Sequence, residues 1–344
     1  MSKKRISFIK RVIDKFLKQV YIRWQNNKRQ RDCRMEKKKF YLILISLSIV
    51  TIIWGLNVIM IKYLSGIFPV VQLSAWRISM AALCLLIFTY SKWKPGIKKL
   101  TLSAWGLIFL VGFTSIFLHQ LLISQGLRFT SGSAGSLILG LNPLTTSLLA
   151  MVLLGDQFNL KRFIGIGLGF TGVLIVVGHP GSAGTDPVKG NLIVFLSMLA
   201  YVSGGLLIKQ AVKQASVFQV TTFSHMFGAL LLLIMWFLFP VEPSVYHANL
   251  FAFGVMVFSG CIATALCTSW WNMAISEIGP SKTTLFLNVM PISSLFFAAL
   301  FLNEKIHLYH ALALLLIVAG IYLGLSRQKG TGLPAKPISI NKAL

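Results

Sequence analysis

The chain has 344 residues, of which 56% are hydrophobic and only 12% are charged, and its formal net charge is +25. Soluble globular domains do not combine so many apolar residues with so few charged ones, so this composition excludes that class. Together with a mean hydropathy of +0.76, it indicates a polytopic membrane protein.

Residues 1–39 form a basic leader with fifteen Lys or Arg and three acids. Its apolar residues recur at helical spacing, which predicts a cationic amphipathic helix on the anionic lipids of the inner leaflet. The alternative partner for such a basic segment is nucleic acid, but the adjacent membrane favours lipid. Because Met35 directly precedes the charged start of the first span, residues 1–34 can also derive from an upstream start codon.

Ten apolar stretches follow the leader. They cover residues 40–64, 69–90, 102–124, 132–154, 162–178, 190–209, 217–239, 250–272, 281–302 and 308–325. Most reach the roughly 20 residues that a helix needs to cross a ~30 Å hydrocarbon layer, and the fifth and tenth are short. Segments this long and apolar predict an all-α bundle of ten transmembrane helices rather than a barrel.

Two halves of the chain repeat one another. Residues 131–177 align without a gap on residues 279–325, 148 positions later. The most telling matches are Pro143 with Pro291, Asp156 with Glu304, and Gly172 with Gly320. Earlier parts of the halves match at an offset of 147, as in Lys62 with Lys209. With five spans in each half, the sequence predicts two inverted repeats, a plan that recurs in secondary transporters.

The expected domain boundaries follow from this repeat. We assign residues 40–178 to the first repeat, 179–189 to an external linker, 190–326 to the second repeat and 327–344 to a cytoplasmic tail. The short loops and the tail on one side carry thirteen Lys or Arg, and the loops on the other side carry three. The positive-inside rule therefore predicts a cell-membrane protein with both termini in the cytoplasm.

Several local motifs resemble one transporter family. They are Trp54-Gly55 with Asn57, Trp76-Arg77, the run from Gly126 to Ser131, Asn142-Pro143 and Leu154-Gly155-Asp156. In order and spacing they resemble the EamA-type branch of the drug/metabolite transporter superfamily, over about residues 40–326. The resemblance implies ten helices in two inverted repeats and the movement of small metabolites or drugs. The second half departs from this pattern, with Asn303-Glu304 in place of Gly155-Asp156.

Arg77 lies about eight residues into the second span, where an uncompensated cation costs at least ~2.5–3.5 kcal/mol. We expect it to face the bundle interior and to attract a carboxylate or phosphate group of a substrate. The alternative is that it snorkels to the outer headgroups. All eight acids lie outside the spans or at their ends. The sequence therefore shows no buried carboxylate for a proton relay, and Asp156 and Glu304 are expected to bond to helix ends or cations.

His119 and His225 are the candidates for proton coupling, because imidazole titrates near physiological pH. The alternative is a structural hydrogen bond between helices, which we favour. Asn142-Pro143 and Pro291 occupy equivalent mid-helix places, and each proline predicts a kink that frees backbone groups. The remaining candidates for a central substrate cavity are Trp54, Asn57, Gln120, Tyr201 and Asn288. Trp270 and Trp271 lie near a span end, which favours an interface anchor.

These features favour a secondary transporter of small metabolites, such as amino acids, related compounds or drugs, that exports its substrate by alternating access at a central cavity. The alternatives are a passive channel, a non-transporting scaffold and, less favoured, a membrane enzyme. The sequence offers no catalytic constellation, metal cluster or cofactor motif, so we expect no enzymatic activity and no cofactor. We expect a monomer or a homodimer with a small-molecule substrate, and no nucleic acid partner.

Overall fold

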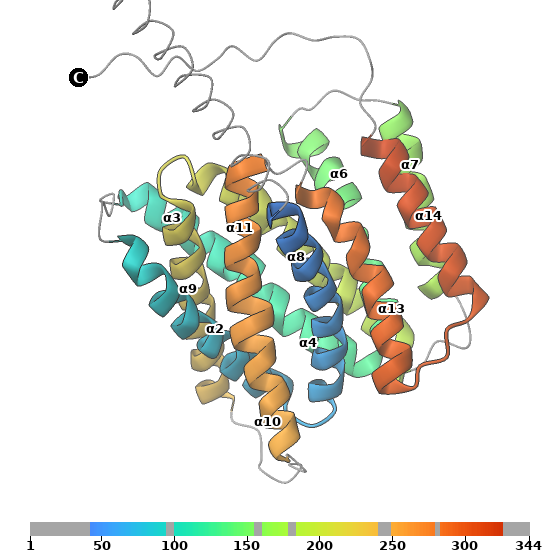
Figure 1. The fold of residues 1–344 in the computed structure, drawn as a ribbon, viewed down its shortest axis with the longest axis horizontal. Coiled ribbons are helices and arrows are strands. Elements are labelled where there is room, and N and C mark those ends of the chain that lie inside the picture. The colour runs from blue at the N-terminus through green and yellow to red at the C-terminus, as the bar shows by residue number, and fades with distance from the viewer. Residues whose placement is uncertain are drawn as a thin grey trace, which may run out of the picture.

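The computed structural model describes residues 42–93, 100–154, 160–177, 184–239, 249–278 and 283–325. The predictions for the basic leader, for the tail from 327 onward and for Asp156 lie outside these ranges. All regular structure within the described ranges is helical, and the helices run alongside one another as a bundle (Figure 1).

The first half holds the Leu42–Ser65 helix, α2 (Val70–Trp93), α3 (Leu102–Val111), η1 (Gly112–Leu118), α4 (His119–Phe129), α5 (Gly132–Leu139), α6 (Asn142–Leu154) and α7 (Leu160–Val177). The second half holds α8 (Pro187–Ala211), α9 (Val217–Leu238), α10 (Leu250–Val257), η2 (Phe258–Leu266), α11 (Cys267–Ile278), η3 (Thr284–Asn288), α13 (Val289–Leu302) and α14 (Leu308–Leu325). The segments α3-η1-α4 and α10-η2-α11 are each one span, as are α5-α6 and η3-α13. The described chain thus forms five spans in each half, as predicted.

Six of the described helices are long and apolar enough to cross a membrane. Three further spans are shorter apolar helices, and the fourth span is interrupted between α5 and α6. Several helices extend beyond the predicted apolar runs, because polar residues continue them past the hydrocarbon. In particular, Asp186 accepts a hydrogen bond from the Lys189 N–H and starts α8 inside the predicted 179–189 linker.

Helix starts reproduce the repeat seen in the sequence. α2 begins at Val70 and α9 at Val217, 147 residues later, whereas α3 begins at Leu102 and α10 at Leu250, 148 residues later. The third and eighth spans also start alike, since Thr101 and Asn249 each cap the helix by accepting the N–H three residues on. The one-residue change of register therefore lies between the second and third spans of each half.

The fourth and ninth spans show that the two halves are inverted. Glu304 follows the end of α13, and its carboxylate accepts hydrogen bonds from the N–H groups of Gly132 and Ser133, at 2.8 and 3.0 Å. These two residues begin α5. The end of the ninth span thus lies beside the start of the fourth, its counterpart, so the two spans are antiparallel. This confirms the inverted repeat.

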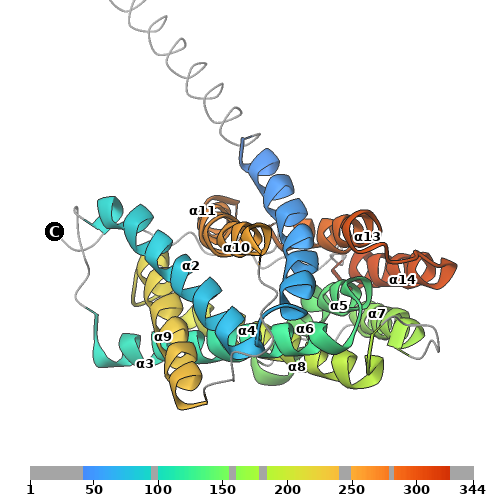
Figure 2. The ribbon, with the colours of Figure 1, turned by 90° about the horizontal axis from the view of Figure 1, so that it is seen from below.

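Helix packing interlocks the halves. α7 packs against α14, α2 against α9, α4 against α8 and α5 against α13. The Leu42–Ser65 helix packs against α11 through Leu47, Val50, Cys267 and Trp271. Figures 1 and 2 show α7 beside α14 at one edge of the bundle and α2, α3 and α9 at the opposite edge. Each span of the first half is therefore completed by a span of the second.

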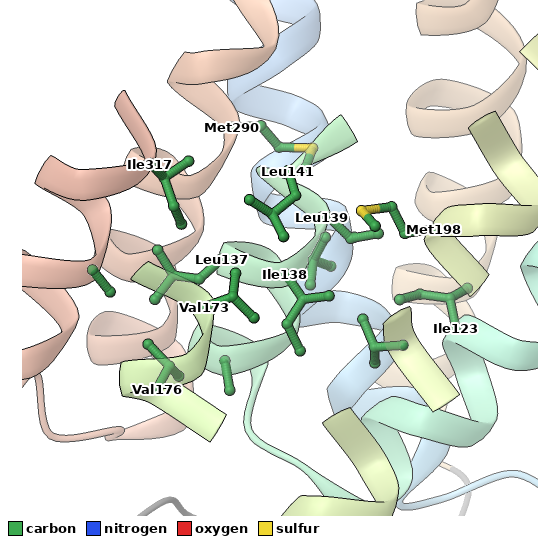
Figure 3. Close-up of a cluster of buried hydrophobic side chains, with 14 of the residues drawn as sticks. Ile123, Leu137, Ile138, Leu139, Leu141, Val173, Val176, Met198, Met290 and Ile317 are labelled. Atoms are coloured by element: carbon green, nitrogen blue, oxygen red, sulfur yellow. The ribbon is translucent and has the colours of Figure 1, made fainter. Parts of the chain in front are cut away.

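The largest apolar cluster lies around α5, where helices from both halves meet. Leu137, Ile138 and Leu139 of α5 contact a shell that includes Met198 of α8 and Met290 of α13 (Figure 3). Lipid tails are as apolar as these side chains, so close packing rather than removal from water stabilises such an interface. The cluster fixes the interrupted fourth span at the centre of the bundle.

Small residues bring α7 close to both α14 and α6. A Cβ added to Gly172 would lie 2.8 Å from the Ala313 carbonyl oxygen, and one added to Gly169 would collide with the Leu144 side chain. Gly167 of the same helix has open space instead. Gly169 and Gly172 therefore lie on a packing face of α7, whereas Gly167 does not.

Candidate functional site

Arg77 of α2 lies inside the bundle with none of its surface exposed. Its Nη1 donates to the Ser259 Oγ of η2 at 3.1 Å, and its Nη2 donates to the Gln120 Oε1 of α4. The predicted interior position is confirmed, and the snorkelling alternative is wrong. Because Arg77 sits more than one turn inside α2, neighbouring spans rather than headgroups surround its guanidinium.

A hydrogen-bond network extends from this guanidinium to the first span. The Ser259 hydroxyl donates to the Asn57 Oδ1 at 2.5 Å, so Asn57, Arg77 and Gln120 belong to one cluster. One turn before Arg77 on α2, the Ser74 hydroxyl donates to the Ser124 hydroxyl of α4 at 3.1 Å. The first, second, third and eighth spans therefore meet at this cluster, which brings three of the predicted cavity residues together.

The charge of Arg77 is not neutralised by any described side chain. Its two hydrogen-bond partners are neutral, and its buried Nε has no partner in the part of the chain that the structure describes. The carboxylates of Asp186 and Glu304 bond to the starts of α8 and α5 instead. An unpaired cation inside a bundle is costly, and an anionic group of a ligand would relieve that cost.

Two π-helical segments flank this cluster, one in each half. η1 directly precedes His119 and Gln120, and η2 contains Ser259. The segments occupy equivalent places of the third and eighth spans. A π-helical turn widens the backbone and is frequent at functional sites, because it changes the direction of the side chains that follow. Their occurrence in both halves indicates a shared requirement rather than a local irregularity.

Glycines allow each π-helical segment to pack closely against the second span of a half, η2 against α2 and η1 against α9. A Cβ on Gly260 would lie 2.7 Å from the Arg77 carbonyl oxygen, and a Cβ on Gly112 would lie 2.7 Å from the Ser224 carbonyl oxygen. These two contacts are equivalent in the repeat. The sequence analysis did not select Ser259 as a site residue. A signal was available, because Ser259 precedes Gly260, which matches Gly112 in the repeat.

Trp54 joins the first span to the eighth. Its indole Nε1 donates to the Ala263 carbonyl oxygen at 2.9 Å, and its ring centroid lies 4.9 Å from that of Trp271. Trp271 is only 6% exposed. The interpretation of Trp271 as an interface anchor is therefore wrong, because its ring fills the space beside Trp54 instead of reaching headgroups.

Both histidines make hydrogen bonds within the bundle. His119 Nδ1 lies 2.7 Å from the Ser197 Oγ on α8, and its ring lies 5.0 Å from that of Tyr201. His225 Nδ1 lies 2.7 Å from the Thr221 carbonyl oxygen of its own helix. The structural hydrogen bond expected between helices is therefore present at His119, while His225 bonds within α9.

These bonds lead to a prediction for proton coupling. His119→Gln and His225→Gln are each expected to leave the shape of the pH profile of transport unchanged, because both imidazoles have structural partners. The measurement is initial transport rate between pH 5 and 8, the range in which histidine ordinarily titrates. A flattened profile in either variant would assign that histidine to coupling.

Each proline for which a kink was predicted follows an interruption of the regular α-helix. α5 ends at Leu139 and α6 begins at Asn142, just before Pro143, while the 3-10 segment η3 ends at Asn288, just before the α13 turn with Pro291. Within the described chain, the buried Oδ1 atoms of Asn142 and Asn288 have no hydrogen-bond partner. The two asparagines therefore offer free acceptors where the regular α-helix is interrupted in the fourth and ninth spans.

The two interruptions lie against each other. A Cβ on Gly140 would lie 2.9 Å from the Pro291 Cγ, and η3 contacts α6. The first span reaches the same place, since the Ser294 hydroxyl donates to the Gly55 carbonyl oxygen at 2.9 Å. Gly55 is two residues from Asn57, so the first span connects the interruptions to the Arg77 cluster.

The sequence matches the EamA-like transporter family twice, over residues 41–178 and 188–326. The chain belongs to this family. Among similar proteins is the uncharacterized transporter YyaM of Bacillus subtilis strain 168, which is 32% identical over 296 residues, covering 83% of this chain and 93% of that protein. A WAT1-related protein of Arabidopsis thaliana, At4g01450, is 24% identical over 299 residues, covering 79% and 82%.

The fold is also similar to a solved protein structure, with a TM-score of 0.59 at 16% identity over 81% of this chain and 95% of that one. That likeness concerns the fold alone. Family membership and the apolar helices establish this EamA-like protein as a multi-pass membrane transporter. Of the two relatives named above, YyaM carries a transporter name.

Proposed function

We propose that this EamA-like transporter is a secondary carrier that exports a small metabolite with a carboxylate or phosphate group, such as an amino acid or a related compound. The observation that carries the proposal is the charge of Arg77, buried among four spans without a described carboxylate partner. A substrate anion would supply charge-assisted hydrogen bonds to the guanidinium, including its unpartnered Nε.

Alternating access is the proposed mechanism. The halves are inverted, so exchanging their conformations would expose a site between them first on one side of the membrane and then on the other. The Arg77 cluster uses residues of both halves, since Asn57, Arg77 and Gln120 lie in the first and Ser259 in the second. A relative movement of the halves would therefore reach the proposed site directly.

The proposed location is the cell membrane, with both termini in the cytoplasm. Thirteen Lys or Arg on one side against three on the other support this orientation. Single cysteines placed at Lys99 and Lys189 are expected to react with an impermeant thiol reagent from opposite faces of the membrane. Reaction from the same face would contradict the orientation.

Counterflow in everted vesicles tests the proposed function. Vesicles loaded with an unlabelled amino-acid mixture are expected to accumulate the radiolabelled mixture transiently, and methyl esters of the same amino acids are expected to compete poorly because they lack the carboxylate. Vesicles without the protein provide the control. A passive channel would equilibrate the label without transient accumulation. Equal competition by the esters would contradict the proposed binding site for the substrate carboxylate.

A further inference from the structure

Glu304 joins the two halves at one end of the bundle. It lies in the short connection between α13 and α14, and its carboxylate accepts hydrogen bonds from the Gly132 N–H at 2.8 Å, the Ser133 N–H at 3.0 Å and the Ser133 hydroxyl at 2.5 Å. All three donors belong to the first half, whereas Glu304 belongs to the second. The contact therefore bridges the repeats.

Neighbouring side chains close the space around this bridge. A Cβ on Gly132 would lie 2.6 Å from the Cδ1 of Ile59, a first-span residue that is 2% exposed. Lys62, one turn further along, interacts electrostatically with Glu304 and reaches the Arg128 carbonyl oxygen at 3.5 Å. The first span, the start of α5 and the connection after α13 thus seal one end of the bundle together.

The chain conformation directs Glu304 onto α5. Asn303 ends α13 in the left-handed region, with φ 51°, and it is the only described non-glycine residue with positive φ. Such a residue turns the chain sharply at a helix end. The carboxylate that follows then satisfies N–H groups that otherwise lack partners at the start of α5, and its charge is favourable there.

We propose that Glu304 is a latch that holds this end of the transport pathway closed, and that its release from Gly132 and Ser133 opens the pathway there. The inference rests on the alternating access of the proposed function. The fourth and ninth spans are antiparallel counterparts, so opening this end moves the start of one away from the end of the other. That movement breaks all three hydrogen bonds at once.

The test uses a protein without its four native cysteines and two single-cysteine reporters. Ile59→Cys reports on the Glu304 end, and Leu206→Cys, at the equivalent place 147 residues later, reports on the opposite end. In Glu304→Gln, which keeps the side-chain shape and removes the charge, labelling of the first reporter by an impermeant maleimide is expected to rise about tenfold, or about 1.4 kcal/mol. Labelling of the second is expected to fall.

Asp186→Asn is the matched control. Asp186 also accepts a backbone N–H at a helix start, but its partner Lys189 lies in the same half. This variant is expected to leave both reporters unchanged. If Glu304→Gln changes neither reporter, the latch is absent. If it exposes only Ile59→Cys, without protecting Leu206→Cys, it loosens the surface locally and the proposal is equally wrong.

A reversible cross-link separates failure of the latch from failure of alternating access. In Ser133→Cys/Glu304→Cys, a short bifunctional thiosulfonate reagent is expected to stop uptake of a radiolabelled amino-acid mixture, and reduction is expected to restore it. If the cross-linked protein still transports, the ends do not separate and alternating access fails. If cross-linking stops transport but Glu304→Gln leaves the reporters unchanged, only the latch fails.

Discussion

Replacing Arg77 by alanine is expected to lower the transport rate by about 100-fold, because two charge-assisted hydrogen bonds to an anionic substrate are worth about 3 kcal/mol. Arg77→Lys keeps the charge but loses the planar fork that binds two oxygens at once. It is expected to retain an intermediate rate, about tenfold below the unmodified protein. The measurement is initial uptake of the radiolabelled amino-acid mixture in everted vesicles.

A folding control is necessary, because Arg77→Ala also removes the groups that donate to the Gln120 Oε1 and the Ser259 Oγ. Arg128→Ala supplies a matched variant, since Arg128 is exposed at the end of α4, and it is expected to transport normally. Thermal unfolding in detergent shows whether each variant is folded. If a folded Arg77→Ala protein transports as well as Arg128→Ala, Arg77 does not bind the substrate.

Gly320→Val is expected to give the largest loss of stability, at least about 2–3 kcal/mol, because overpacking against rigid neighbours cannot be relieved by a rotamer change. A Cβ at Gly320 would meet the Gly165 carbonyl oxygen and would lie 2.9 Å from the Gly169 backbone nitrogen. Both contacts are with backbone. α14 would therefore have to move away from α7 along their shared face.

The control for this prediction is Gly167→Val, which makes the same substitution on α7 at a position with no atom within 4 Å of the added Cβ. It tests the intrinsic effect of a β-branched residue in a helix without the collision. Gly320→Val is expected to unfold at a clearly lower temperature in detergent than Gly167→Val. Equal unfolding temperatures would mean that close packing of α7 and α14 does not stabilise the bundle.

The ten spans and their inversion could be predicted because both follow from patterns that the sequence itself displays. Apolar run length decides whether a segment spans the bilayer, and the matched Pro143 and Pro291 reveal the duplication whatever the intervening residues are. The predicted positions of the helix ends were less accurate, because capping groups such as Asp186 extend α8 beyond its apolar run. Hydropathy does not report such caps.

The candidate site was only partly predictable. The interior position of Arg77 follows from the cost of a cation in lipid, but its partner Ser259 lies 182 residues away and is chosen by packing between halves. The π-helical segments were missed because their residues are as apolar as those of an ordinary helix. Trp271 was misassigned because distance from a span end does not determine which way a ring points.

The pairing of each span with one from the other half constrains how the protein is made. When the ribosome has released residues up to α7, the faces that will receive α8, α9, α13 and α14 still lack their occupants. The nascent first half must therefore remain inserted in the bilayer as loosely associated helices. Packing is completed only when α14, the last described span, has left the translocation channel and packs against α7.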